Sequence, residues 1–312
     1  MVNTTTIHME KYLEIFGDSF NGYASYLWRE IMNPSWTNYF YWLLIISVLV
    51  FALEVWLPWR KKQKVLRKDF WLDLFYLFFN FFLFSLVGYN AISDVFVELF
   101  NDGLAGIGIT NLIAIKVTNF PFWTQLLIMF VIADFIQWNI HRLLHRVPFL
   151  WEFHKVHHSV KEMGFAAQFR FHFMETIIYK ALQYIPLAMI GFGVEQFIVI
   201  HMIAVFIGHL NHANLNWDYG PLKYVLNNPK MHLWHHAKKI PGVQKYGVNY
   251  GLSLSLWDYM FGTAHMPYHQ AELELGFPGD KNYPTAFHEQ LLKPFKKDSE
   301  RSSFVKSESN PS

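Results

Sequence analysis

The feature that most constrains the fold is an apolar stretch, residues 39–57, which carries a single charge, Glu54, in 19 residues. A helix of about 20 apolar residues crosses the hydrocarbon core of a bilayer. Residues 60–68 follow directly and hold six basic residues and no acidic one, and such clusters stay on the cytoplasmic side of a membrane. We therefore expect a membrane-spanning helix with the N-terminus outside and a basic turn in the cytoplasm.

Further apolar segments predict a polytopic, all-α membrane bundle. Residues 70–87 and 122–140 are each long enough to cross a bilayer, and Pro121 suits the start of the second helix. Residues 177–191 and 194–210 are shorter, and we expect them to form a helical hairpin that dips into the membrane. Residues 93–115 fit a loop, an interfacial helix or a re-entrant segment equally well.

Composition limits the partners and cofactors. The chain of 312 residues is 53% hydrophobic and 16% charged, with a net charge of +2, which favours a lipid partner over nucleic acid. The absence of cysteine excludes disulfides, iron–sulfur clusters, thiolate-bound haem and cysteine-based zinc sites. Any metal must therefore be held by histidines and carboxylates.

Histidine spacing is the strongest chemical signal. Of 16 histidines, 12 lie in the stretch from His141 to His236, and ten of these form the patterns HRLLH (141–145), HKVHH (154–158), HLNH (209–212) and HLWHH (232–236). Residues three and four apart share one face of a helix, so each pattern aims its imidazoles in one direction. The candidate metal ligands are His141, His145, His154, His157, His158, His212, His232, His235 and His236.

The number of candidate ligands indicates two metal ions, because one zinc ion uses about four. Imidazole suits Zn, Cu, Fe and Ni, so histidine alone does not name the metal. Ferritin-like bundles use Glu-x-x-His pairs, and no acidic residue stands three places before any of these histidines. The expected topology brings every cluster to the cytoplasmic edge, in a helical cap that carries the site.

Residues 122–266 resemble the fatty acid hydroxylase superfamily, which includes sterol desaturases, sterol methyl oxidases and alkylglycerol monooxygenase. Besides the histidine clusters, the likeness includes Gly220-Pro221-Leu222, Asn249-Tyr250-Gly251 and residues 256–263. It implies two non-haem irons, O₂ and an external electron donor such as a cytochrome, a ferredoxin or a pterin. It also implies that His212 is the isolated ligand between the second and third clusters.

The chain is then expected to have three parts. Residues 1–120 form an N-terminal segment with two transmembrane helices and the cytoplasmic basic turn, and residues 121–290 form the hydroxylase-like catalytic domain. Residues 291–312 are polar and are expected to be a disordered tail. The metal site and the C-terminus are expected in the cytoplasm.

Several residues near the clusters keep more than one interpretation. His209 fits a ligand, a group that orients a ligand, or a polar helix residue. His172 fits a group that orients a ligand or a structural residue. His201, among apolar residues of the expected hairpin, fits a functional residue in the membrane and a core histidine equally well. Metal-bound histidines usually donate their other N–H to a carboxylate or a carbonyl. The candidate carboxylates are Asp134, Glu152, Glu162, Glu175, Asp218 and Asp258, of which Asp258 is favoured.

These observations predict a membrane-bound di-iron oxidoreductase that uses O₂ to hydroxylate or desaturate a lipid C–H bond of the sterol, alkylglycerol or fatty-acyl type. Two other classes stay open. A metal transporter also places histidines in a membrane, but it spreads them along a path. A bis-histidine haem carrier needs pairs of histidines facing each other across a bundle.

Overall fold

The computed structural model describes residues 4–35, 38–80, 117–184, 190–240, 245–267 and 273–296, with Leu187 and a few isolated positions between 95 and 108. Within these residues the protein is helical, and extended segments pair only at isolated bridges, which confirms the all-α prediction for this part of the chain. The α-helices are α1 (Thr4–Met32), α2 (Tyr39–Trp56), α3 (Phe70–Phe78), α5 (Phe122–Arg146), α6 (Pro148–His158), α7 (Phe173–Tyr179), α9 (Val194–His212), α10 (Pro229–His235), α11 (Leu256–Met260) and α12 (Phe287–Leu292).

Short helical turns complete these elements. A π-helical turn, Lys180–Tyr184, continues α7. The 3-10 turns are η2 (Val117–Asn119), η3 (Phe165–Phe169), η5 (Gly220–Tyr224), η6 (Asp280–Asn282) and η7 (Lys293–Phe295). The predicted helical hairpin corresponds to α7, the π-helical turn and α9, with Gly191 between the arms at a φ of 99°, a conformation that glycine adopts without steric cost.

Two described helices, α2 and α5, are long and apolar enough to cross a membrane. Large apolar side chains on α2 face outward: Leu44 is 51% exposed, Val48 58% and Trp56 76%. A helix in the core of a soluble protein would bury such side chains, so this surface supports membrane association. Of the expected span 70–87, α3 covers Phe70–Phe78 and residues 81–87 lie outside the described residues, as do residues 297–312 of the expected tail.

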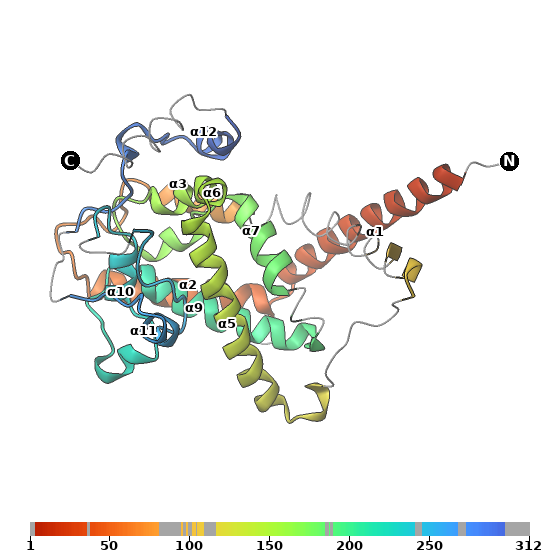
Figure 1. Cartoon of the computed structure of the whole chain (residues 1–312), viewed down its shortest axis with the longest axis horizontal. Helices are drawn as coiled ribbons and strands as arrows, with labels where there is room; N and C mark the ends of the chain where they lie inside the picture. Colours follow the sequence, from red (N-terminus) through yellow and green to blue (C-terminus); the bar gives the residue numbers. More distant parts are fainter. Residues whose placement is uncertain are drawn as a thin grey trace.

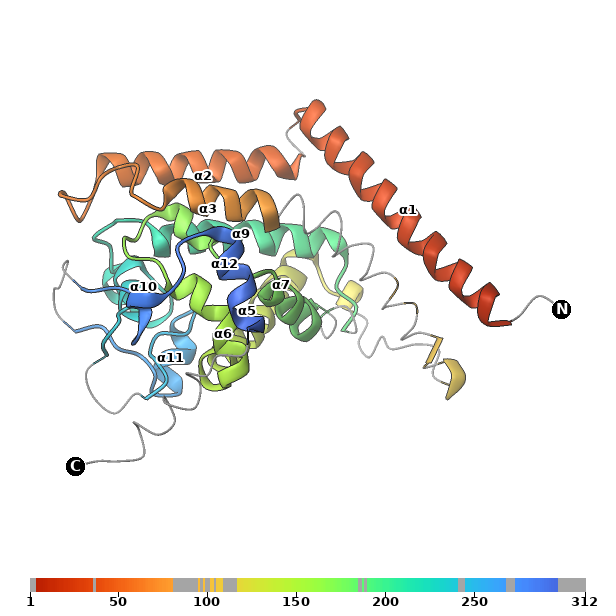
Figure 2. The same cartoon turned by 90° about the horizontal axis from the view of Figure 1, so that it is seen from above.

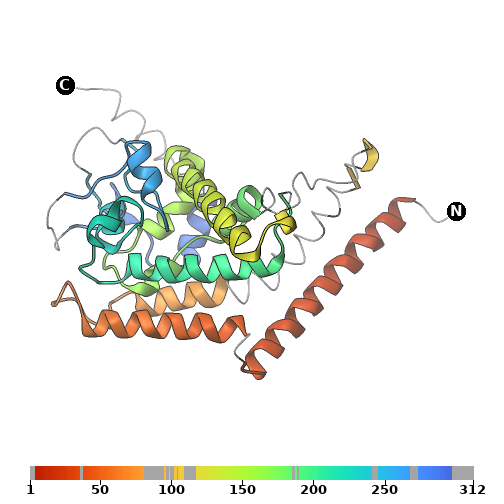
Figure 3. The same ribbon diagram turned by 90° about the horizontal axis from the view of Figure 1, so that it is seen from below.

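The helices α2 and α9 lie side by side, and η3 contacts both of them and α3. The helix α1 leaves the body at an angle (Figures 2 and 3). A cluster of buried apolar side chains, including Val50, Phe70, Phe165 and Leu215, fills the space between α2, α3, α9 and η3. The single charge of α2 also belongs to this contact, because Glu54 accepts the backbone N–H of Phe165 at 2.8 Å.

The basic turn after α2 is attached to the end of α9. The backbone N–H of Trp59 donates to the carbonyl of Asn214 at 2.9 Å, and the N–H of Arg60 donates to the Asn214 side chain at 2.9 Å. The long helix α5 crosses the body and leads into α6 at Pro148 (Figure 1). The C-terminal ends of α2 and α9 therefore lie close together.

Candidate metal centre

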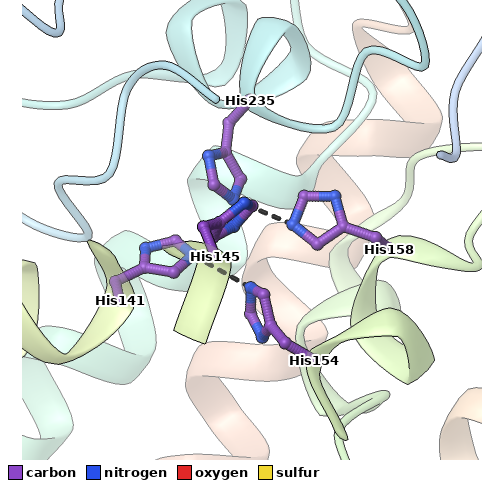
Figure 4. A group of neighbouring side chains, drawn as sticks. All are labelled: His141, His145, His154, His158 and His235. Atoms are coloured by element: carbon purple, nitrogen blue, oxygen red, sulfur yellow. Dashed lines mark hydrogen bonds between the residues drawn. The ribbon is translucent and has the colours of Figure 1, made fainter. Parts of the chain in front are cut away.

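The nine predicted ligands come together in two adjoining groups. The first contains His141, His145, His154, His158 and His235 (Figure 4), and the second contains His157, His212, His232 and His236. In each group one nitrogen from every histidine lies within 4.8 Å of the others. All nine are buried except His145, which is half-buried.

Helical spacing divides each cluster between the two groups. On α6, His154 and His158 are four apart and turn to the first group, whereas His157 turns to the second. The pattern of the third cluster is reversed, with His235 in the first group and His232 and His236 in the second. Successive helical residues point about 100° apart, so each HxxHH sequence serves both groups.

Local signals fix the helices that carry these residues. Pro148 stands at the first position of α6, where its missing N–H costs nothing. The helix α10 begins in the same way at Pro229, and the Asn228 side chain caps it by accepting the N–H of Met231 at 3.0 Å. The helix α9 runs two residues past the predicted boundary at residue 210, and this extension carries His212 to the second group.

Hydrogen bonds set the protonation of six of the nine rings. Each of these donates from Nδ1 to an acceptor. The pairs are His141 with Tyr250 O (2.7 Å), His145 with Tyr246 O (3.1 Å), His154 with Glu175 Oε2 (2.7 Å), His157 with Arg170 O (3.0 Å), His212 with Gly208 O (2.7 Å) and His235 with Val248 O (2.8 Å). A carbonyl oxygen only accepts, so Nδ1 carries the proton and Nε2 keeps its lone pair.

These Nε2 lone pairs face one another. The Nε2 atoms of His141 and His154 are 3.1 Å apart, and those of His157 and His212 are 3.3 Å apart. The Nε2 of His145 is buried and has no partner among the described residues. Two lone pairs at this distance repel, and a cation between them removes the repulsion. The arrangement therefore fits metal ions bound at Nε2.

Burial keeps the rings in the form that binds metal. It lowers the pKa of His154 to about 3, and it lowers the pKa of His158 and His236 well below the ordinary value of 6.5. Desolvation disfavours the imidazolium cation, and neighbouring histidines add to this effect. Neutral imidazole is the form that ligates a metal.

The carboxylate that contacts a ligand is Glu175, on α7. It accepts the Nδ1–H of His154 and also the backbone N–H of His172 at 3.2 Å. The favoured candidate, Asp258, contacts no ligand. It accepts the N–H groups of Tyr250 and Gly251 at 2.9 and 2.8 Å, and so it supports the loop whose carbonyl oxygens hold His141 and His235.

The other candidate carboxylates have local roles. Asp134 accepts from the N–H of Ser253 and the indole of Trp257, Glu152 pairs with Lys155, and Asp218 accepts from Gly220 and pairs with Lys230. Glu162 lines a polar cavity that adjoins the metal centre. The loop 245–250 holds three of the histidines through its backbone carbonyls. Every residue has such a carbonyl, so the sequence gives no sign of this role.

The three histidines with open interpretations lie outside both groups. His209 Nε2 is 3.0 Å from the Ser47 hydroxyl, and its ring packs against Phe165 and Phe169. His172 Nε2 donates to the carbonyl of Leu291 at 3.0 Å, which is a structural contact. His201 lines the cavity described next, and its ring lies 5.9 Å from that of Tyr39.

A cavity of about 290 Å³ opens beside the histidines, between α5, α7 and α9. Five ligands contribute to one end of it: His141, His154, His157, His212 and His232. The remaining wall is largely apolar, with Met129, Phe130, Leu187, Phe197 and Ile200, and it includes the amides of Gln137, Gln168 and Gln183. A mostly apolar cavity with a few polar groups suits an amphiphilic molecule.

The sequence is similar to known proteins over the part of the chain that carries the histidine groups. Residues 126–263 match the fatty acid hydroxylase family. An ornithine lipid hydroxylase of Rhizobium tropici is 36% identical over 175 residues, 56% of this chain and 51% of that protein. An alkylglycerol monooxygenase of Xenopus tropicalis is 30% identical over 146 residues, 45% of this chain and 30% of that protein. A very-long-chain aldehyde decarbonylase of Oryza sativa is 26% identical over 142 residues, 42% of this chain and 21% of that protein.

The matched part of the chain thus spans about half the length of the first of these relatives and less of the others. No solved structure matches the chain. The family resemblance predicted from the histidine clusters is confirmed, and the relatives include a lipid hydroxylase, an alkylglycerol monooxygenase and an aldehyde decarbonylase. Residues 126–263, which carry all nine of the clustered histidines, are therefore a fatty acid hydroxylase domain, and the relatives that match them belong to the same superfamily.

Proposed function

We propose that the protein is a membrane-bound, non-haem di-iron oxygenase that hydroxylates or desaturates a C–H bond of a lipid. The observation that carries this proposal is the double group of converging Nε2 atoms at the end of a largely apolar cavity. The gathering of all nine histidines disfavours a transporter, which would spread ligands along a path. Two adjoining groups of five and four histidines also exceed the single facing pair that a haem needs.

The nine histidines would hold two iron ions, which with O₂ and electrons from an external donor supply the oxidising power for an unactivated C–H bond. The protein supplies the arrangement. Glu175 and the carbonyls of the 245–250 loop hold the imidazoles in one tautomer. The apolar wall of the cavity positions the lipid and limits the access of water to the reacting carbon.

The substrate is proposed to be a polar lipid. The relatives act on an ornithine lipid and on alkylglycerols by name, and both kinds of molecule join a polar group to a hydrocarbon chain. The cavity has the same mixed character, because the amides of Gln137, Gln168 and Gln183 line it together with the apolar wall. Amide side chains can hydrogen-bond a head group or a linkage while the chain lies along α5 and α9.

The metal assignment is tested by iron content and the visible spectrum of the purified protein. Two irons per chain and no haem Soret band are expected. His145→Ala, His157→Ala and His235→Ala should each abolish turnover while the protein still inserts into the membrane. Zinc as the only bound metal, or a Soret band, would contradict the proposal.

The reaction is tested by comparing the lipids of cells with and without the protein. We expect one class of polar lipid to gain an oxygen atom, for hydroxylation, or to lose two hydrogen atoms, for desaturation. Cells that produce His235→Ala serve as the control, because the variant keeps the membrane protein but removes a ligand. An unchanged lipid profile at full iron loading would exclude a cellular lipid as substrate.

The orientation proposed is a multi-pass protein with the metal site and C-terminus in the cytoplasm. The attachment of the basic turn to Asn214, two residues after His212, supports this orientation, since it keeps the basic residues and the histidines together. A reporter after Ser312 should read cytoplasmic and one before Asn3 extracytoplasmic. Reporters on the same side would contradict the expected odd number of crossings.

A further inference from the structure

A second cavity adjoins the metal centre. It has a volume of about 560 Å³ and is bounded by the start of α3, the turn after α6 and residues 273–290. Its lining includes none of the nine histidines. Two wall residues adjoin the centre: Ser159 follows His158, and the carbonyl of Arg170 holds His157.

Charged side chains dominate this cavity. Six are cationic (Arg67, Lys68, Lys161, Arg170, Lys238 and Lys281) and four are anionic (Asp69, Glu162, Glu274 and Asp280). Most of the carboxylates are already engaged: Asp280 pairs with Lys161 and Lys238, Glu274 pairs with Lys238, and Asp69 pairs with Arg170. The buried Asp73, behind the wall, pairs with both arginines.

Two buried donors remain after these pairs are formed. The side chain of Arg67 is 2% exposed, and its Nη2 binds Asp73, but its Nη1 has no partner among the described residues. The hydroxyl of Tyr283 is also buried and has no hydrogen-bond partner among the residues that the structure describes. A buried polar group without a partner costs free energy, so both donors favour an added acceptor, and both residues line this cavity.

Gly164 makes room for the arginine. A Cβ atom at this position would lie 2.7 Å from Arg67 Nε, which is closer than side chains tolerate. The placement of the guanidinium therefore depends on the absence of a side chain there.

We propose that this cavity binds a phosphate group, held by Arg67 Nη1 and the Tyr283 hydroxyl, with Lys68 and Lys281 at its rim. Donors from several separate residues suit a tetrahedral oxyanion with many acceptor oxygens better than a planar carboxylate. Free phosphate and the head group of a phospholipid share this chemistry.

The first experiment uses the full-length, metal-loaded protein in an uncharged detergent. Inorganic phosphate is titrated at constant ionic strength, with chloride as the comparison, and the unfolding temperature is recorded. A saturable stabilisation by phosphate and none by chloride is expected. Phosphatidylglycerol bilayer discs, compared with phosphate-free galactolipid discs, provide the second arm.

Variants connect the stabilisation to this cavity. Tyr283→Phe should weaken phosphate binding about tenfold, the effect of losing one charge-assisted hydrogen bond. Glu162→Gln should tighten it, because Glu162 is an acidic side chain in the same cavity. Tyr76→Phe is the matched control, since the Tyr76 hydroxyl already donates to Gln290 at 2.7 Å, and it should leave phosphate binding unchanged.

Each result decides the proposal. Stabilisation by free phosphate that follows the expected order of variants identifies a soluble ligand, and the same order seen only with phosphatidylglycerol identifies a lipid head group. If neither source stabilises the protein, or if binding is the same in Tyr283→Phe and the parent protein, the cavity holds only water and the proposal is wrong. Because iron content is measured in the same samples, this outcome is independent of the di-iron assignment.

Discussion

At the scale of single residues, the position of a histidine within a helical turn decides what it does. His209 and His212 lie one turn apart at the end of α9, and the sequence leaves the role of His209 open. In the structure His212 joins the second group, whereas His209 turns to Ser47 on α2. One helix thus uses one imidazole at the metal centre and the other in helix packing.

The first prediction compares the same substitution at these two positions. His212→Gln removes one of four histidines from the second group, so bound iron should fall from two ions toward one per chain. His209→Gln should keep both irons, because glutamine can still hydrogen-bond Ser47. Iron per chain, measured on the two variants side by side, checks this. Equal iron loss in both would make His209 a ligand.

Glu175 is the second residue with a specific expectation. Glu175→Ala removes the acceptor that holds the Nδ1–H of His154, and loss of such a partner typically lowers metal affinity about 10–100-fold. Glu152→Ala is the matched control, because Glu152 lies on α6 but pairs with Lys155. Iron release to a chelator measures the effect. If Glu175→Ala releases iron as slowly as the parent protein, Glu175 does not orient His154.

At the scale of elements, the segment after α10 contributes through its backbone. The carbonyls of Tyr246, Val248 and Tyr250 each accept from a histidine. Asp258, on α11, organises this segment from behind with bonds to two backbone N–H groups, to Trp138 Nε1 at 3.0 Å and to the Thr263 hydroxyl at 2.6 Å. The metal centre therefore depends on a loop as much as on its helices.

The third prediction concerns this buried carboxylate. In Asp258→Asn one oxygen becomes an NH₂ group that faces N–H donors, so the free energy of unfolding should fall by about 2–4 kcal/mol. Asp218→Asn is the control, because the Asp218 side chain is partly exposed, at 43%, and its substitution should change stability by less than about 1 kcal/mol. Thermal unfolding of both variants tests this, and equal stability of the two would contradict it.

At the scale of the whole molecule, the buried histidines link stability to pH. The folded pKa values of His154, His157, His158, His235 and His236 lie below the ordinary 6.5 because burial disfavours their charged forms. The unfolded chain therefore binds more protons than the folded chain as the pH falls below about 6.5. The stability contributed by these groups is present above that pH and is lost as the pH falls.

The fourth prediction follows from this loss of stability with falling pH. The unfolding temperature of the metal-free protein should be nearly constant above pH 7 and should fall from about pH 6.5 downward, with up to about 1.4 kcal/mol lost per histidine and pH unit. The iron-loaded protein should fall in the same direction, because protons compete with metal for the imidazoles. Unfolding curves between pH 5 and 8 measure both forms. Constant or rising stability toward pH 5 would contradict the prediction.

The sequence by itself determined the helical class, two apolar helices and the set of clustered histidines. Helical periodicity is local, so the HxxHH spacing already implies that adjacent histidines point in different directions. The charge-poor stretch 39–57 likewise predicts α2 without reference to any other segment.

Only the tertiary structure decided how these residues are shared and supported. The division of His157 and His158 between two groups depends on the helices that approach α6. The choice of Glu175 over Asp258 beside a ligand, and the turn of His209 toward Ser47, depend on contacts between residues far apart in the chain. Such contacts arise from packing, and the carbonyls that hold the histidines are chemically the same at every residue, so no sequence pattern marks them.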